Sequence, residues 1–228
     1  MNTCSTPSLI AISGGSGAGK TWLAGRLQAV FGPAATRLSL DDFYQDRSHL
    51  TLKQCARINF DHPRAIDWSS VVEVLHACRA GRPARLSRYD FASHSRLAAA
   101  ELWQPKPLVF VEGLWLLKRP EVRRLFDLKV FIQCDAPLRL QQRLQRDVAE
   151  RGRTPASVQA QFTQTVAPMH DRYVAPDARW ADVILNQPLG EPALQSLVER
   201  IRSLPSAILP RTTRCITHSQ PEKIYGTF

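Results

Sequence analysis

The residues with the clearest chemical purpose form one glycine-rich stretch, residues 14–21, with the sequence GGSGAGKT. The stretch fills every fixed position of the pattern G-x-x-x-x-G-K-[ST], the phosphate-binding P-loop. Glycines let the backbone wrap closely around phosphate, so several N–H groups and a helix N-terminus point at the anion. Lys20 adds a cation, and the Thr21 hydroxyl can ligate Mg²⁺. The predicted phosphate-binding residues are Gly14, Gly15, Ser16, Gly17, Ala18, Gly19, Lys20 and Thr21.

The flanks of this stretch fit the same interpretation. Residues 9–12 form a short apolar run of buried-strand type, and residues 22–31 have the pattern of a helix that Gly32 and Pro33 end. Strand, loop and helix therefore follow in the order that a P-loop needs. The alternative is a chance glycine-rich turn before a helix.

Acidic residues follow two other strand-like runs. Asp41 and Asp42 follow residues 36–40, and Glu112 ends the apolar run 108–111. Ligands of open α/β sheets collect at the carboxyl ends of the strands, so we expect Asp41 to face the P-loop crevice. Its alternative role is that of a helix cap or turn residue. An acid after a central strand is the Walker B pattern, in which the carboxylate helps to hold Mg²⁺.

Arginine is concentrated in one segment. Residues 136–150 are predicted to form a helix whose buried stripe consists of Leu140, Leu144 and Val148. Five arginines lie beside that stripe or just after the helix: Arg139, Arg143, Arg146, Arg151 and Arg153. Like charges at helical spacing repel each other, which favours an anion that the arginines surround, and hence a phosphate-covering lid. The alternative is a solvated basic face.

These groups need a scaffold, and the remaining pattern alternates strands with helices. Further strands are expected at residues 129–132 and 181–185, and further helices at residues 50–58, 71–78, 155–166 and 193–204. Residues 85–91 alternate enough to be a strand. The aromatic and polar residues that follow, 89–96, fit either a stacking wall with a polar reader or a hairpin packed on the core. The pattern predicts an α/β fold with a parallel central sheet.

Composition narrows the class of protein. The 228 residues suit one α/β domain, and the net charge of +10 fits either nucleic acid or polyphosphate nucleotides as partners. Five scattered cysteines without a C-x-x-C pair favour reduced thiols in the cytosol and argue against a disulfide framework or a zinc site. No signal peptide is recognisable, and no apolar run approaches the roughly 20 residues that span a bilayer.

Taken together, these segments resemble the uridine kinase (uridine/cytidine kinase) family, relatives of phosphoribulokinase and pantothenate kinase. The matching pieces are residues 14–21, 40–44, 59–63, 89–96, 111–113, 143–153 and 181–184. The pieces at 59–63 and 89–96 are the most specific to the family. The resemblance implies a P-loop NTPase-type three-layer fold with a parallel central sheet and a helical lid insert. It also implies phosphorylation of the 5′-hydroxyl of uridine or cytidine by ATP or GTP with Mg²⁺.

The resemblance further implies roles for individual residues. Asp41 matches the catalytic carboxylate near the 5′-hydroxyl, with Lys20 and Arg151 as the other catalytic residues. Asp61 matches the acid that holds the ribose hydroxyls. The nucleoside pocket corresponds to Tyr44, Phe60, Tyr89, Phe91 and His94, with His94 at the pyrimidine edge. Arg143, Arg153 and Gln161 match substrate-side lid positions, Arg146 and Arg151 match phosphate-facing ones, and Thr21 and Glu112 match the Mg²⁺ side.

The chain also departs from the family. Gln142 stands where many members have an arginine, Trp22 follows the P-loop where a small or aliphatic residue is usual, and residues 186–188 read NQP instead of PRG. We expect one kinase domain over residues 1–204, with the lid at about 136–168, and a flexible tail over 205–228. The resemblance implies a homotetramer. The scattered cysteines favour a cytoplasmic location, the lack of a long apolar run argues against a membrane partner, and a nucleic-acid partner is not expected. Alternative functions are a kinase of another small hydroxyl substrate, such as pantothenate or ribulose 5-phosphate, or a P-loop protein that binds nucleic acid.

Overall fold

A sheet of five parallel strands forms the centre of the fold within the described residues, which are 6–55, 58–91, 93 and 95–205 of this computed structural model. The strand order is β2-β5-β1-β6-β7. The strands are β1 (Ser8–Gly14), β2 (Ala35–Ser39), β5 (Leu108–Gly113), β6 (Leu128–Gln133) and β7 (Val183–Asn186). The predicted α/β class with a parallel central sheet is therefore confirmed.

The central strand β1 is buried on both faces. Its side chains alternate, so Leu9 and Ala11 pack into one core while Ile10 and Ile12 pack into the other. This explains why residues 9–12 are continuously apolar, as parallel strands covered on both faces are. Neighbouring β5 has the same apolar character and lies in register with β1, with Ser13 opposite Gly113 at the carboxyl end.

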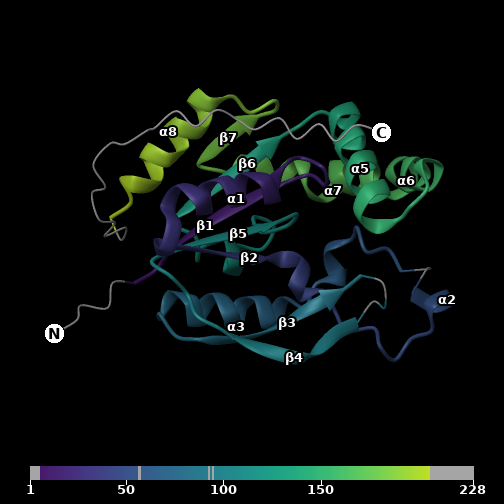
Figure 1. Ribbon diagram of the computed structural model, residues 1–228, viewed down its shortest axis with the longest axis horizontal. Helices are drawn as coiled ribbons and strands as arrows, with labels where there is room; N and C mark the ends of the chain where they lie inside the picture. The colour runs from purple at the N-terminus through teal and green to yellow at the C-terminus, as the bar shows by residue number, and fades with distance from the viewer. Residues whose placement is uncertain (1–5, 56–57, 92, 94, 206–228) are drawn as a thin grey trace.

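Helices cover both faces of the sheet, which gives the three layers (Figure 1). Helices α1 (Lys20–Phe31) and α8 (Glu191–Arg202) lie on one face and contribute to the core that contains Ile10. Helix α3 (Trp68–Arg79) lies on the other face with the short α4 (Pro120–Arg123). Short turns and helices connect these elements: η1 (Gly32–Ala34), η2 (Leu40–Phe43), α2 (Leu52–Cys55), η3 (Pro63–Ala65) and η5 (Ala175–Trp180).

An antiparallel hairpin lies beyond α3, made of β3 (Ala84–Asp90) and β4 (Ser95–Trp103) (Figure 1). Of the two readings of residues 89–96, the hairpin is therefore present, and the aromatic residues at its tip also face a cavity, as described below. The pairing register shifts between Ser87 and Tyr89, which leaves Arg88 at an irregularity of the β-bulge kind.

The lid is a run of helices at one end of the sheet. It consists of α5 (Ala136–Arg151), α6 (Pro155–Gln161), the π-helical η4 (Phe162–Val166) and α7 (Ala167–Tyr173). Of the helix predicted at residues 50–58, the described residues contain the four-residue α2, while residues 56–57 lie outside them. The predicted buried stripe of α5 is wrong.

The predicted flexible tail, 205–228, lies outside the described residues except for Pro205. Within the described ranges, no helix combines the length and apolarity needed to cross a membrane.

Candidate active site

The P-loop connects β1 to α1 and is held in shape by its glycines. Gly17 and Gly19 have φ angles of 79° and 87°, in the region that glycine adopts without strain. Gly19 is also the N-cap of α1 and offers no side-chain acceptor, so the first N–H groups of the helix remain available to an anion. Lys20 Nζ donates a hydrogen bond to the Gly15 carbonyl at 2.9 Å. The loop thus has the geometry of a phosphate cradle.

Oxygen ligands gather where β2 and β5 end beside the P-loop. Thr21 Oγ1 and Ser39 Oγ both donate to Glu112 Oε1, at 3.3 Å and 2.9 Å. Burial raises the pKa of Glu112, the nearby charge of Asp41 raises it further, and Lys20 acts in the opposite direction. Hard oxygen ligands of this kind suit Mg²⁺. The sequence analysis did not single out Ser39. Its position at a strand end, two residues before Asp41, was a usable signal.

Asp41 and Asp42 are adjacent in η2, but their side chains have different surroundings. Asp41 lines the same cavity as Lys20 and Glu112, and its N–H donates to Ser39 Oγ at 3.2 Å. Asp42 lies outside that cavity and pairs with Arg88 at 3.2 Å. The turn after β2 therefore presents a single carboxylate to the P-loop.

Aromatic rings form one wall of the cavity. Tyr44 is central, with its ring centroid 6.0 Å from that of Phe60, 5.2 Å from Tyr89 and 5.8 Å from Phe91. Tyr44 donates its hydroxyl to the Phe60 carbonyl at 3.2 Å, whereas the buried Tyr89 hydroxyl has no partner among the described residues. The predicted nucleoside wall is thus assembled from three separate segments. His94, predicted to lie at the pyrimidine edge, falls outside the described residues.

Asp61 faces the cavity opposite the P-loop side chains. Its Oδ2 accepts a hydrogen bond from Thr165 of the lid at 3.2 Å, and its N–H donates to Asn59 Oδ1 at 2.9 Å. Burial raises the pKa of Asp61, while Arg143 opposes that shift. A half-buried carboxylate with one lid hydroxyl has acceptor capacity left for two further donors.

Helix α5 turns its charged face inward, contrary to expectation. Arg139, Arg143 and Asp147 are the buried residues of the helix, whereas Val148 of the predicted apolar stripe is 39% exposed. Arg143 Nη1 donates to Ser16 Oγ at 2.6 Å, which ties the helix to the P-loop. The apolar periodicity failed because the surface that α5 covers is the polar P-loop and its cavity.

Asp147 is fully buried and lies among four of the lid arginines. Its carboxylate is 2.8 Å from Arg146, 3.4 Å from Arg143, 3.6 Å from Arg151 and 3.9 Å from Arg153. Burial would raise its pKa, but these guanidinium groups outweigh burial and hold the pKa below its usual value. Asp61 also attracts Arg143 and Arg153, so two carboxylates face four guanidinium groups and an excess of two positive charges is left. An anionic ligand of this cluster stays a prediction.

Two cavities meet at the P-loop. The first, about 770 Å³, is lined by nearly all the predicted catalytic and substrate residues: Lys20, Thr21, Asp41, Tyr44, Phe60, Asp61, Tyr89, Phe91, Glu112, Arg143, Arg146, Arg151, Arg153 and Gln161. The second, about 660 Å³, lies on the other side of the loop. Both are lined by Lys20, Thr21, Arg146 and Glu150. These four residues therefore mark where a group could pass from one ligand to another.

The second cavity contains the residues that depart from the resembled family. Trp22, Gln142 and Gln187 all line it. The Gln187 amide donates to the Ala18 carbonyl at 2.9 Å and lies against Gly19, where a Cβ atom would be 2.8 Å from Nε2. The segment after β7 thus touches the P-loop itself, and substitutions there alter the cavity that a nucleotide base would enter.

Arg139 of α5 and His170 of α7 lie against the P-loop from behind, a position that the sequence did not predict for either residue. Arg139, predicted to surround an anion with the other arginines, packs behind the loop instead, with Nε donating to the Cys134 carbonyl at 3.2 Å. His170 of α7 lies beside it, and a Cβ atom on Gly15 would be 2.8 Å from His170 Nδ1. Burial lowers the pKa of His170 to about 4, and the charges of Arg139 and Lys20 act in the same direction, against Asp171. We infer that a neutral His170 keeps the P-loop in place.

The burial of His170 predicts that its contribution to the free energy of unfolding depends on pH. The unfolded chain protonates His170 near its usual pKa of 6.5, whereas the folded chain does so only near 4. The contribution of His170 to the free energy of unfolding should therefore decrease as the pH falls from 6.5 to 4, whereas Asp177, whose pKa burial raises to about 6, contributes in the opposite direction. His170→Phe should flatten this decrease in urea titrations across the range. His76→Phe, at an exposed histidine, is the control and should leave the profile unchanged. A His170→Phe profile parallel to that of the wild type would contradict the inference.

Within the part of the chain that the structure describes, no group of three or more His, Cys, Asp or Glu side chains could hold a metal ion. Magnesium in phosphate-transferring sites is typically held by one or two carboxylates together with substrate phosphates. The corner formed by Thr21, Ser39 and Glu112 fits that arrangement.

The chain is similar to known kinases in sequence and in fold. The chain matches the sequence model of the phosphoribulokinase / uridine kinase family over residues 9–190. A uridine kinase of Chloroflexus aggregans is 44% identical over 78% of this chain and 86% of that protein. A uridine kinase of Deinococcus deserti is 41% identical over 86% of this chain and 96% of that protein. The solved phosphoribulokinase of Rhodobacter spheroides shares the fold, with a TM-score of 0.61 at 17% identity over 80% of this chain and 70% of that chain.

Proposed function

Because this chain belongs to the phosphoribulokinase / uridine kinase family, we propose that it is a nucleoside kinase. It transfers the γ-phosphate of ATP or GTP to the 5′-hydroxyl of uridine or cytidine. The observation that carries this proposal is the meeting of a P-loop cavity with an aromatic, carboxylate-lined cavity at Lys20, Thr21, Arg146 and Glu150. The names of the similar uridine kinases support the choice of nucleoside.

The donor nucleotide binds through its phosphates. Backbone N–H groups of the P-loop and the start of α1 receive the phosphate oxygens, and Lys20 and Arg146 neutralise their charge. The base occupies the cavity that Trp22 and Gln187 line. Bound Mg²⁺ would neutralise phosphate charge, and Thr21, Ser39 and Glu112 are the residues that would hold it or its water ligands.

The acceptor nucleoside binds on the other side. Its base stacks among Tyr44, Tyr89 and Phe91, and the ribose hydroxyls donate to Asp61. The 5′-hydroxyl then lies beside Asp41, which orients it and accepts its proton. Phosphoryl transfer needs positioning and charge neutralisation more than covalent help, so these groups suffice for the step.

Product formation tests the proposal. Uridine, cytidine and adenosine are each incubated with ATP and with GTP, and nucleoside monophosphates are quantified. We expect uridine and cytidine to be phosphorylated well and adenosine poorly. No monophosphate from any nucleoside, together with activity toward pantothenate or ribulose 5-phosphate, would favour the alternative acceptor substrates of the same family.

Asp61 gives a sharper test of the acceptor site. Asp61→Asn should raise KM for uridine by about 10–100-fold, because hydrogen bonds to a charged group contribute about 1.5–3 kcal/mol. The change in kcat should be smaller. Steady-state kinetics with uridine and 2′-deoxyuridine measures the effect, and the variant should lose most of the discrimination between them. Asp135→Asn, at an exposed aspartate outside both cavities, is the matched control. Unchanged discrimination would remove Asp61 from the ribose site.

Three further properties remain predictions. The resemblance implies a homotetramer and contact between His94 and the pyrimidine edge, and the scattered cysteines favour a cytoplasmic location. His94→Ala should therefore narrow the preference for pyrimidine over purine nucleosides, which the same nucleoside panel would measure.

A further inference from the structure

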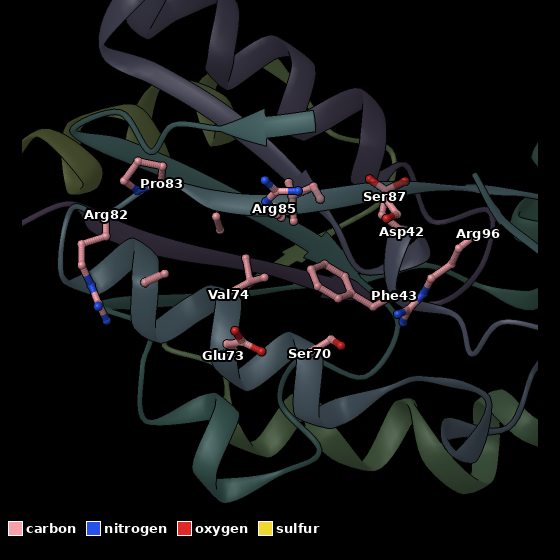
Figure 2. Close-up of a pocket in the computed structure, with 13 residues that line it drawn as sticks. Asp42, Phe43, Ser70, Glu73, Val74, Arg82, Pro83, Arg85, Ser87 and Arg96 are labelled. Atoms are coloured by element: carbon pink, nitrogen blue, oxygen red, sulfur yellow. The ribbon is translucent and has the colours of Figure 1, made fainter. Parts of the chain in front are cut away.

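A third cavity, about 500 Å³, lies between α3 and the hairpin strand β3. It shares no lining residue with either of the cavities at the P-loop. Figure 2 shows Ser70 and Glu73 of α3 on one side, Arg85 and Ser87 of β3 on the other, and Phe43 and Val74 between them. The nucleoside kinase proposed above has no use for this cavity.

The lining combines an apolar floor with a positive rim. Phe43, Val74 and Leu86 form the floor and are buried residues of the core. Two rim charges are already compensated, since Asp42 pairs with Arg88 at 3.2 Å and Arg96 pairs with Asp67 at 3.1 Å.

The uncompensated rim charges are Arg82, Arg85 and Glu73, which make no ion pair within the described part of the chain. They leave an excess of one positive charge. A ligand that matches both the floor and the rim is a small organic anion with an apolar body.

The cavity shares a wall with the catalytic cavity. Within the four-residue η2, Asp41 faces the catalytic cavity, while Asp42 and Phe43 face the third cavity. The Asp42 carboxylate also lies near the backbone of Tyr89, whose N–H lowers the carboxyl pKa and whose ring lines the catalytic cavity. A ligand that displaces Asp42 or Phe43 therefore acts on two residues of the catalytic wall.

We propose that this cavity is a second ligand site for an organic phosphate or carboxylate with an apolar body, and that its occupant alters turnover through η2. Arg85 binds the anionic group beside β3, Arg82 adds positive charge at the far end of the rim (Figure 2), and Phe43, Val74 and Leu86 contact the body. The binding part of this proposal is independent of the proposed kinase function, whereas the effect on turnover depends on it.

Calorimetric titration with phenyl phosphate tests the binding. The catalytic cavities are first saturated with uridine and a non-hydrolysable ATP analogue. We expect one further binding event, which R82Q/R85Q weakens at least about tenfold because the charge-assisted contact of Arg85 and the nearby charge of Arg82 are both lost. Inorganic phosphate and benzyl alcohol, each with only half of the required chemistry, should bind at least about tenfold more weakly than phenyl phosphate.

The control variant is R200Q/R202Q, which removes the same charge from α8 and should bind phenyl phosphate like the wild type. Loss of binding once the catalytic cavities are filled, or equal binding by R82Q/R85Q and the wild type, would overturn the site. In a turnover assay at saturating substrates, phenyl phosphate should change kcat about twofold or more in the wild type and not in R82Q/R85Q. Binding with an unchanged kcat would overturn the coupling through η2. Binding by a protein that phosphorylates no nucleoside would overturn the kinase proposal alone.

Discussion

Asp41→Asn should lower kcat by about 10²–10⁴, the range typical of a lost acid–base catalyst. Asp41 is the carboxylate of η2 that lines the catalytic cavity with Lys20 and Glu112. Asparagine keeps the shape and part of the hydrogen bonding but removes the charge and the proton acceptor. The transition state is loose, so the proton leaves late and the carboxylate mainly orients the hydroxyl. Nucleoside KM should change far less, as measured by steady-state kinetics.

The neighbouring residue provides a matched control. Asp42 lies outside the catalytic cavity and pairs with Arg88, so Asp42→Asn should be milder. Burial raises the pKa of Asp42, and its loss as an anion therefore costs the fold little. If Asp41→Asn keeps more than about a tenth of wild-type turnover, or if Asp42→Asn is the more damaging change, Asp41 is not the base. Circular dichroism of both variants checks that the fold is intact.

Arg151→Ala should lower kcat on the order of 10²–10³, the loss expected when one group that stabilises transition-state charge is removed. The Arg151 guanidinium lies 5.1 Å from the Phe91 ring centroid and 3.6 Å from Asp147, so it spans the catalytic cavity from lid to nucleoside wall. The Arg151 side chain is 38% exposed, and the buried Asp147 keeps three other guanidinium partners when Arg151 is removed. The unfolding midpoint should therefore hardly move.

The competing explanation is a structural ion-pair network around Asp147. It predicts the opposite pattern for Arg151→Ala, a clear loss of stability with normal turnover. Denaturation and kinetics on the same preparation distinguish the two, with Arg200→Ala on the exposed face of α8 as control. Arg143 is less suited to this test, because it is almost fully buried and bonded to Ser16 and Gln161, so its removal would combine both effects.

Part of this site was predictable because its chemistry is local. Residues 14–21 specify a phosphate cradle by themselves, since glycines, lysine and threonine at fixed spacing act within one turn of chain. The continuous apolar runs at β1 and β5 likewise identified buried parallel strands, because a strand covered on both faces has no polar side to show. Glu112, the acid at the end of the apolar run of β5, could then be placed at the carboxyl edge of the sheet without any long-range contact.

Other features were decided only by the tertiary structure. Ser39 meets Glu112 because β2 pairs with β5 in parallel, a contact across 73 residues that no local pattern encodes. His170 reaches Gly15 only because the lid helices fold back over the P-loop. Helix α5 shows the physical reason most clearly. Its apolar periodicity predicted a Leu140 stripe inside, but periodicity measures apolarity and not what the helix covers. Because α5 covers a polar loop and a cavity, Arg143 and Asp147 are buried there, where each compensates the charge of the other.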